Sequence, residues 1–285
     1  MLGGSDSESG DEEPSGDADG VPTTLAAHEA ARKHDASKSR PEAEAGGSEC
    51  LFVTDTASGW VAPESQHYNG LLVQRSATWG DHQAWVDKMA AASDNPLSET
   101  VQLRQAASAL DVVVENGPHD ELLERLAVVG ARLVAAASLP EPLAQQVKAD
   151  VCSVGVIVGA LCSSSKLLVK LETLGENVCG RWHCDHYVGR AIVSYTGVTG
   201  TLYTGDENVN FWELENCGNN DHIIRDQREV RAVAVGDILF IKGTKFPGQG
   251  ANSLVHKSAE KSYHKDGRLL NRLALKIDVA TKGRV

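Results

Sequence analysis

Basic residues are scarce in this sequence relative to acidic ones. Lys and Arg number 27 against 39 Asp and Glu, which gives a net charge of −12 over 285 residues. Residues 1–50 hold twelve acidic and four basic residues, a balance of −8, so −12 less −8 leaves only −4 for the other 235 residues. A nucleic-acid-binding protein needs clustered Lys and Arg to neutralise phosphates. The composition therefore argues against nucleic acid as a partner.

Long apolar runs and paired cysteines are also missing. The longest apolar run lies around residues 151–163, and it is shorter than the roughly 20 residues that a membrane-spanning helix needs. The six cysteines include no C-x-x-C pair, and no signal-peptide pattern opens the sequence. They therefore indicate free thiols rather than a disulfide framework. We expect an intracellular, cytoplasmic protein with no membrane partner.

Composition divides the chain into three parts. Residues 1–48 are rich in Ser, Asp, Glu, Gly and Pro, and so few apolar groups cannot offset the entropy of ordering, which predicts a disordered acidic tail. Residues 49–164 carry apolar stripes at helical spacing and are predicted to form a mainly helical support region. Residues 165–280 alternate short β-branched runs with Gly, Asn and Asp, the pattern of an all-β sandwich or barrel. We expect residues 49–280 to form one α+β domain.

The expected elements follow from these patterns. Helices are predicted over about 80–92, over 119–137, and from Pro142 onward, and short strands over 51–55 and 70–75. In the β-rich part, strands are predicted in the runs KLLVKLETL, RAIVSYTG, GTLYTG, EVRAVAV, DILFIKG, NSLVHKS and RLALKIDV. Gly236-Asp237 separates two apolar runs, which favours a hairpin.

The densest group of possible metal ligands is the run CGRWHCDH. Residues i and i+2 of a strand share a face, so His183 and Asp185 can present an imidazole and a carboxylate to one ion. His256, in the extended run NSLVHKS, is the best third ligand, because His222 and His264 lie in polar loops. Two His and one carboxylate leave open positions on a metal, the arrangement that non-haem Fe(II) oxygenases use.

Zinc coordination is an alternative at the same place. Cys179, Cys184 and His186 could join His183 to offer the thiolate and imidazole ligands that Zn²⁺ prefers. Strand alternation, however, turns Cys184 and His186 away from His183, and Cys184 is then expected to be a small buried apolar residue. A further alternative is a hydrogen-bonded His183–Asp185 pair that binds no metal.

Arginines that follow His256 are candidates for binding a carboxylate. Arg272 begins RLALKIDV sixteen residues after His256, and its guanidinium could form two parallel hydrogen bonds with a carboxylate or serve in a structural salt bridge. Arg268, twelve residues after His256, is the second candidate. Tyr195 is expected on a strand near the cavity, where it could contact a bound cofactor.

The order His-x-Asp, His, Arg resembles the 2-oxoglutarate and Fe(II)-dependent oxygenases. That resemblance implies a C-terminal double-stranded β-helix, a cupin-like jelly roll, braced by the N-terminal helices. It also implies Fe(II) and 2-oxoglutarate as cofactors, with Arg272 on the distal carboxylate of 2-oxoglutarate. The substrate, a small molecule or a protein, is not indicated.

A second resemblance covers roughly residues 50–280. The runs RWHCDHYVGRAIVSYTGVTGTLYT, VAVGDILFIKG, LVHKS and RLALKID, in that order, resemble the family called domain of unknown function eighteen twenty-six. Some bacterial members of that family are encoded near zinc-responsive genes and metal chaperones. This resemblance therefore implies an alternative function, a cupin-like metal-binding protein in zinc or iron homeostasis without oxygenase activity.

Overall fold

The computed structural model describes residues 50–92, 97–102, 119–164, 166–176, 178–216, 218–248 and 253–279. All of them fall in one compact unit, Ser48–Val285. The acidic tail predicted for residues 1–48 lies outside the described residues.

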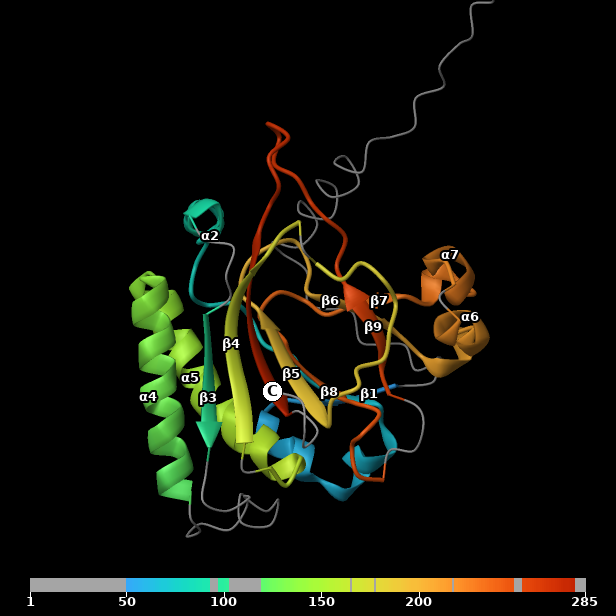
Figure 1. Cartoon of the computed structure of the whole chain (residues 1–285), viewed down its shortest axis with the longest axis horizontal. Helices are drawn as coiled ribbons and strands as arrows, with labels where there is room; N and C mark the ends of the chain where they lie inside the picture. Colours follow the sequence, from blue (N-terminus) through green and yellow to red (C-terminus); the bar gives the residue numbers. More distant parts are fainter. Residues whose placement is uncertain are drawn as a thin grey trace, which may run out of the picture. The chain divides into compact units, whose positions relative to one another are not determined.

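The described residues form strands, helices and short 3-10 turns (Figure 1). The strands are β1 (Leu51–Thr54), β2 (Gly70–Val73), β3 (Leu97–Gln102), β4 (Lys166–Leu174), β5 (Gly189–Ser194), β6 (Thr201–Thr204), β7 (Arg231–Ala232), β8 (Ile238–Lys242), β9 (Val255–Ser258) and β10 (Arg272–Val279). The helices are α2 (Gln83–Ala92), α4 (His119–Ala137), α5 (Glu141–Leu161), α6 (Phe211–Glu215) and α7 (Asn220–Ile223). The 3-10 turns are η1 (Ala57–Val61), η2 (Pro63–His67), η3 (Asp206–Asn208) and η4 (Gln227–Glu229).

Two sheets organise these strands. The large sheet has seven strands in the order β1-β2-β8-β5-β10-β4-β3, and all its pairs are antiparallel except β1–β2. The small sheet has the order β7-β6-β9 and is antiparallel. The structure therefore confirms a mixed α+β fold with a large sheet.

The alternation of side chains along β10 separates an apolar face of the large sheet from a charged one. Leu273, Leu275 and Ile277 join the main hydrophobic core together with side chains of α4 and α5. Lys276 and Asp278, at the intervening positions, belong to the opposite face because successive side chains of a strand alternate. One face of β10 therefore packs against the helices, and its other face carries charged side chains.

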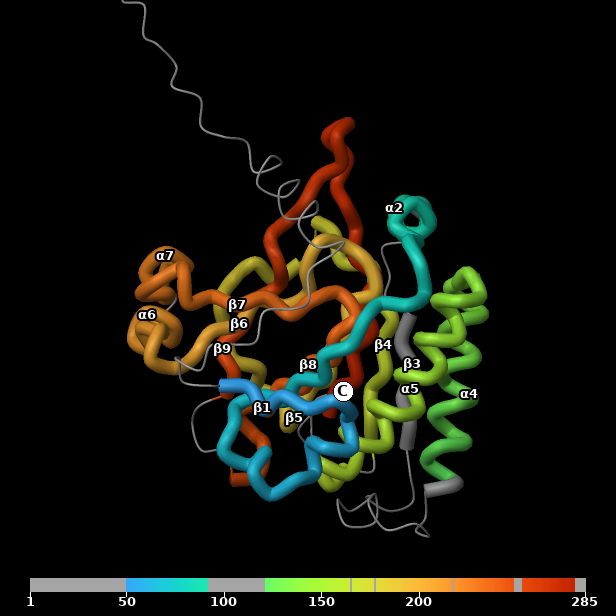
Figure 2. The backbone as a smooth tube through the Cα atoms, turned by 180° about the vertical axis from the view of Figure 1, so that it is seen from behind, coloured from blue at the N-terminus to red at the C-terminus, as the bar shows by residue number. Residues whose placement is uncertain are grey.

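Helices α4 and α5 pack together (Figures 1 and 2), with α4 beside β3 and α5 beside β4. Val147, Val151 and Val154 of α5 are fully buried in the core. Gly155 allows the close approach of α4, because a Cβ there would lie 2.7 Å from a methyl group of Leu126. Pro142 lies in the first turn of α5, where its missing N–H has no helical partner to lose. The predicted helices at 119–137 and after Pro142 are both present.

The predicted hairpin at Gly236-Asp237 is wrong. The strands on either side belong to different sheets, because β7 pairs with β6 whereas β8 pairs with β2 and β5. Gly236 has φ +99° and donates its N–H to the carbonyl oxygen of Ser194. The turn therefore carries the chain from the small sheet to the large one, a transition that local turn chemistry cannot distinguish from a hairpin.

Residues 49–164, predicted to be mainly helical, contribute more strands to the large sheet than their helical pattern suggested. The short strands predicted at 51–55 and 70–75 are present as β1 and β2, and β3 was not predicted. Three of the seven strands of the large sheet thus precede residue 165. Among the described residues, no helix is long and apolar enough to span a membrane.

Candidate metal centre

His183, Asp185 and His256 come together beside the small sheet. His256 lies on β9, paired with Tyr203 of β6. His183 forms an isolated antiparallel bridge with His256, in which each backbone N–H donates to the other carbonyl oxygen at 3.0 Å. The sequence predicts an extended strand for the CGRWHCDH run, but His183 is the one residue of that run with a β-bridge assignment. The bridge is sufficient to place His183 beside His256, and Asp185 follows two residues later.

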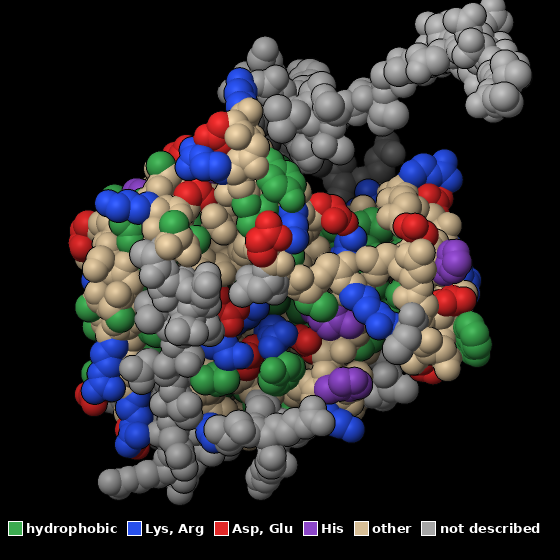
Figure 3. Space-filling model, turned by 45° about the horizontal axis from the view of Figure 1, so that its top comes forward, with side chains coloured by type: hydrophobic (Ala, Val, Ile, Leu, Met, Phe, Trp, Pro, Cys, Tyr) green, Lys and Arg blue, Asp and Glu red, His purple; other side chains and the backbone are tan. Residues whose placement is uncertain are grey.

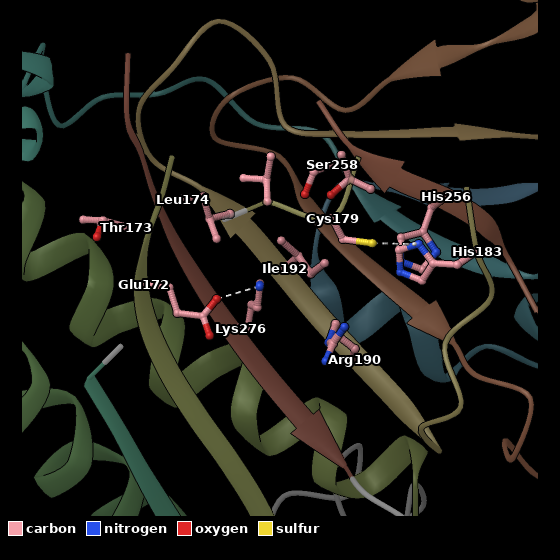
Figure 4. A pocket seen from close by; sticks show the side chains of 12 residues that line it. Glu172, Thr173, Leu174, Cys179, His183, Arg190, Ile192, His256, Ser258 and Lys276 are labelled. Carbon is pink, nitrogen blue, oxygen red and sulfur yellow. Dashed lines mark hydrogen bonds and ion pairs between the residues drawn. The ribbon is translucent and has the colours of Figure 1, made fainter. Parts of the chain in front are cut away.

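The side chains of these three residues converge. Their ligand atoms all lie within 4.8 Å of one another, and the Nε2 atoms of His183 and His256 lie 3.8 Å from different oxygens of Asp185. The imidazole centroids are 4.4 Å apart, and Figure 4 shows the two rings together at one end of a pocket. Within the part of the chain that the structure describes, no other group of His, Cys, Asp and Glu has this spacing.

Backbone carbonyl groups orient both imidazoles through Nδ1. His183 Nδ1 donates to the carbonyl oxygen of Arg181 at 2.8 Å, and His256 Nδ1 donates to that of Leu254 at 2.9 Å. A carbonyl oxygen only accepts, so each Nδ1 carries a proton, and Nε2 is the nitrogen that has a lone pair whenever the ring is neutral. The Nε2 atoms are those nearest Asp185. Two oriented imidazoles and a carboxylate form a donor set that fits Fe(II) or Zn²⁺.

Burial keeps His256 uncharged. It lowers the pKa of His256 to about 4, although the neighbouring Asp185 carboxylate raises that pKa. At neutral pH the ring therefore has no proton to lose before it can bind a cation. Its side chain is 4% exposed, whereas that of His183 is 31% exposed. Access to the cluster is therefore from the side of His183.

A chain of charges lies behind Asp185 on the large sheet. Arg190 Nη1 donates to both Asp185 oxygens at 3.2 and 3.1 Å, and its Nε and Nη2 donate to Asp278 at 2.6 and 3.2 Å. Lys170 also pairs with Asp278 at 3.0 Å. Burial alone would raise the pKa of Asp278, but the hydrogen bonds from Arg190 hold it below its ordinary value. The acidic and basic groups of this chain of charges lie in contact, so their opposite charges compensate one another.

A polar cavity of about 310 Å³ opens at the cluster. Figure 3 shows acidic, basic and histidine side chains meeting near the centre of one face. On the floor of the cavity Lys276 pairs with Glu172 at 2.6 Å. The lining residues are Glu172, Thr173, Leu174, Val178, Cys179, His183, Arg190, Ile192, Thr201, His256, Ser258 and Lys276. The cavity is large enough for a small ligand beside the His183 and His256 side chains.

Arg272 lines a second cavity, which shares Leu174 and Val178 with the first. Arg272 is 7% exposed, and burial lowers its pKa to about 10. Its Nη1 donates to the carbonyl oxygen of Thr199 at 3.3 Å, and no carboxylate among the described residues forms an ion pair with it. A buried cation with no anionic partner is costly and is therefore suited to an anionic ligand.

Two of the predicted cofactor-binding residues lie away from the cluster. Tyr195 is buried on the helix-covered face, and its hydroxyl donates to Asp150 of α5 at 2.7 Å. Arg268 is 69% exposed and pairs with Asp266. The structure thus places both side chains away from His183, Asp185 and His256, because Tyr195 faces the helices and Arg268 lies in a solvent-exposed turn.

The remaining candidate ligands do not complete a closed site. Cys179 Sγ lies 3.8 Å from Nδ1 of His183, the atom that faces away from Asp185. Cys184 Sγ donates to the carbonyl oxygen of Ser253, and His186 lies 3.3 Å from Thr244 Oγ1. Of the two loop histidines, His264 pairs with Asp87 of α2 at 2.7 Å, and His222 lies on α7. None of the five belongs to the metal-ligand group among the described residues.

Sequence reasoning missed Arg190, Asp278 and Lys276. The signal was available in RLALKIDV, where Arg272, Lys276 and Asp278 alternate with apolar residues and so share one face of a strand. The role of Arg190 was harder to predict from the sequence, because its pairing opposite Asp278 depends on the antiparallel register of β5 and β10.

The comparison with protein families identifies residues 100–278 as a match to "Protein of unknown function (DUF1826)". The match covers more than half of the chain. The chain belongs to the DUF1826 family. The matched range includes all three residues of the metal-ligand group and Arg272. A search of the curated proteins found no match.

Solved structures of dioxygenases show a distant similarity to this DUF1826 chain. Dioxygenase for auxin oxidation 1 from Arabidopsis thaliana, in complex with 2-oxoglutarate, is 7% identical with a TM-score of 0.39, over 81% of this chain and 91% of that one. The dioxygenase for auxin oxidation of rice is 9% identical with a TM-score of 0.37, over 82% and 83%. The Fe(II)/(alpha)ketoglutarate-dependent dioxygenase TqaL is 13% identical with a TM-score of 0.35, over 80% and 87%. Similarities this low do not assign an activity.

Proposed function

We propose that this chain is a non-haem Fe(II) and 2-oxoglutarate-dependent oxygenase. The observation that carries the proposal is the convergence of His183, Asp185 and His256 in an open pocket, with both Nε2 atoms free to bind a cation. Three protein ligands on one side of a metal leave positions for other molecules. Iron bound there would supply oxidative chemistry with dioxygen and 2-oxoglutarate as co-reactants.

The order of strands supports a double-stranded β-helix. Along the chain, β4, β5, β8 and β10 lie in the large sheet, and they alternate with the His183 bridge, the β6–β7 pair and β9 in the small sheet. Such alternation winds the chain back and forth between two sheets, as in a jelly roll. The proposed ligands then come from the small-sheet side, and Arg190, Arg272 and Lys276 from the large sheet.

Arg272 is proposed to bind the distal carboxylate of 2-oxoglutarate. Of the cations near the two cavities, Arg190 and Lys276 already have carboxylate partners, whereas Arg272 has none among the described residues. An anionic ligand gains most from the cation that has no partner. The ligand would extend from His256 past Ser258 and Thr201, which are paired in the small sheet. Leu174 and Val178 would line its path.

The role of this chain's own side chains follows from their contacts. The backbone carbonyl groups hold the imidazole rings, Arg190 holds Asp185, and burial of His256 and Asp185 keeps water from one side of the cluster. His256 has no proton to release before it binds a cation, because burial lowers its pKa to about 4. Substrate would approach from the exposed side of His183.

The alternative function is metal binding in zinc or iron homeostasis. A closed site would support it, with Cys179 or His186 as a fourth ligand. Their side chains contact Arg181, His183 Nδ1 and Thr244 instead. The proposal therefore favours the oxygenase.

Absorption spectroscopy of the full chain tests the oxygenase proposal. Metal-free protein is titrated anaerobically with Fe(II) and then with 2-oxoglutarate. We expect a visible charge-transfer band that needs both additions and is absent in His183→Ala. Arg272→Met should weaken 2-oxoglutarate binding about 10- to 100-fold, whereas the matched exposed variant Arg268→Met should not. Tight zinc binding with no band would contradict the oxygenase and favour metal homeostasis.

A further inference from the structure

Arg190 is held between two carboxylates on β5. One guanidinium donates to both oxygens of Asp185 and to both oxygens of Asp278, at distances from 2.6 to 3.2 Å. The ring of Tyr187 lies 4.3 Å from the guanidinium carbon. The planar fork of an arginine bound in this way has little freedom left.

The sheet register itself places Asp278 in position to hold Arg190. The two residues are direct partners in the antiparallel pair β5–β10, and Asp278 is completely buried. A buried carboxylate is costly unless cations compensate for it. Lys170 of β4 is its second cation. Asp278 is therefore anchored in the centre of the large sheet and transmits that rigidity to Arg190.

Asp185 has weaker support of its own. It lies beyond the single bridge of His183, in a segment without regular structure. Its backbone carbonyl accepts from the N–H of Thr244 at 2.9 Å, which fixes the main chain but leaves the carboxylate to rotate. The contacts with Arg190 are the hydrogen bonds that restrict this rotation.

We propose that Arg190, held by Asp278, is a positioning residue that fixes the carboxylate of Asp185 for metal binding. This inference rests on the metal site of the proposed function. A carboxylate already oriented toward His183 and His256 loses less entropy when it binds a cation. A purely structural salt bridge would stabilise the fold without altering metal affinity, which makes the two roles separable.

Cobalt titration of the full chain tests the proposal. Co(II) binding is followed through visible absorption, which reports both affinity and ligand geometry without any turnover. Arg190→Met should weaken Co(II) binding about 10- to 100-fold and change the absorption spectrum. Arg190→Lys keeps the charge but loses the fork, and we expect an intermediate loss. Asp278→Asn should weaken binding too, and the Arg190→Met/Asp278→Asn double variant should be no worse than Arg190→Met, because Asp278 acts through Arg190.

Lys170→Met is the matched control. It removes the other cation of Asp278 but no contact of Arg190 or Asp185, so it should lower thermal stability while Co(II) affinity stays within about twofold. Equal Co(II) binding by folded Arg190→Met and wild-type chains would overturn the positioning role alone. Absence of Co(II) binding by the wild-type chain would overturn both this role and the metal site.

Discussion

Gly197 adopts a backbone conformation that other residues rarely reach, and it lies against Arg272. Its φ is +101°, and a Cβ there would lie 2.9 Å from Cδ of Arg272 and closer still to Cγ. We predict that Gly197→Ala displaces the guanidinium and weakens 2-oxoglutarate binding about 10-fold or more, because charged hydrogen bonds are lost. Isothermal calorimetry on the Fe(II)-loaded chain measures this change.

Gly267 provides the comparison for that substitution. Its φ is +82°, but a Cβ there would meet no atom within 4 Å. Gly267→Ala should therefore show only the backbone cost, about 1–2 kcal/mol in the free energy of unfolding. If both variants bind 2-oxoglutarate equally well, the position of Arg272 does not depend on Gly197.

The titration of Lys242 makes the free energy of unfolding depend on pH in the alkaline range. Its Nζ is buried and donates to the carbonyl oxygens of Ser65 and Gln66 at 2.6 and 3.2 Å. Burial lowers its pKa from 10.5 to about 8. Between these two pH values the unfolded chain holds a proton that the folded chain has released, so the free energy of unfolding rises with pH.

We predict that Lys242→Met removes this rise. Urea unfolding in steps from pH 7.5 to 10.5 should give a shallower pH dependence for the variant than for the wild-type chain. Parallel curves for the two proteins would show that the ammonium group is as well solvated in the folded chain as in the unfolded one.

At the scale of elements, Tyr195, the residue directly after β5, connects the end of that strand to α5. Its hydroxyl donates to Asp150, which also forms a bidentate ion pair with Arg75. Burial, together with the negative charge of Asp150, raises the pKa of Tyr195 well above its ordinary value. The contact therefore joins a helix to the sheet and contributes nothing directly to the cavity.

We predict that Tyr195→Phe lowers the free energy of unfolding by about 1–3 kcal/mol, because Asp150 loses a buried donor. Metal and 2-oxoglutarate affinities should stay unchanged. Tyr263→Phe is the control, since Tyr263 is 48% exposed and its loss should change stability by less than about 0.5 kcal/mol. A loss of 2-oxoglutarate affinity in Tyr195→Phe would instead support the cofactor contact that the sequence predicts.

The elements of the β-rich part were predictable because each has its own local pattern. RLALKIDV alternates cleanly and forms β10, and NSLVHKS contains β9. Pairing was not predictable to the same degree. Gly236 looks like a hairpin residue, yet its strands join separate sheets, because pairing depends on contacts distant in sequence.

For the whole molecule, metal binding should couple to folding. The three candidate ligands come from the segment that precedes β5 and from β9, which are far apart in the sequence, so the unfolded chain cannot present them together. We predict that metal at about 100 times its dissociation constant raises the free energy of unfolding by about 2.7 kcal/mol. Thermal unfolding with and without Fe(II) or a chelator measures the effect. His183→Ala should abolish the difference, and a shift that persists in that variant would place the metal elsewhere.

The sequence alone was enough to propose His183, Asp185 and His256 as metal ligands and Arg272 as a carboxylate-binding residue, because ligand chemistry, two-residue spacing and extended context are local properties. The tertiary structure decided how they are arranged. It brought the ligand atoms of the three candidate residues within 4.8 Å of one another, left Arg272 without an ion-pair partner among the described residues, and turned Tyr195 toward the helices. It also added Arg190 and Asp278, which meet only through the register of β5 and β10. Register between distant strands is set by packing of the whole domain, and no single segment encodes it.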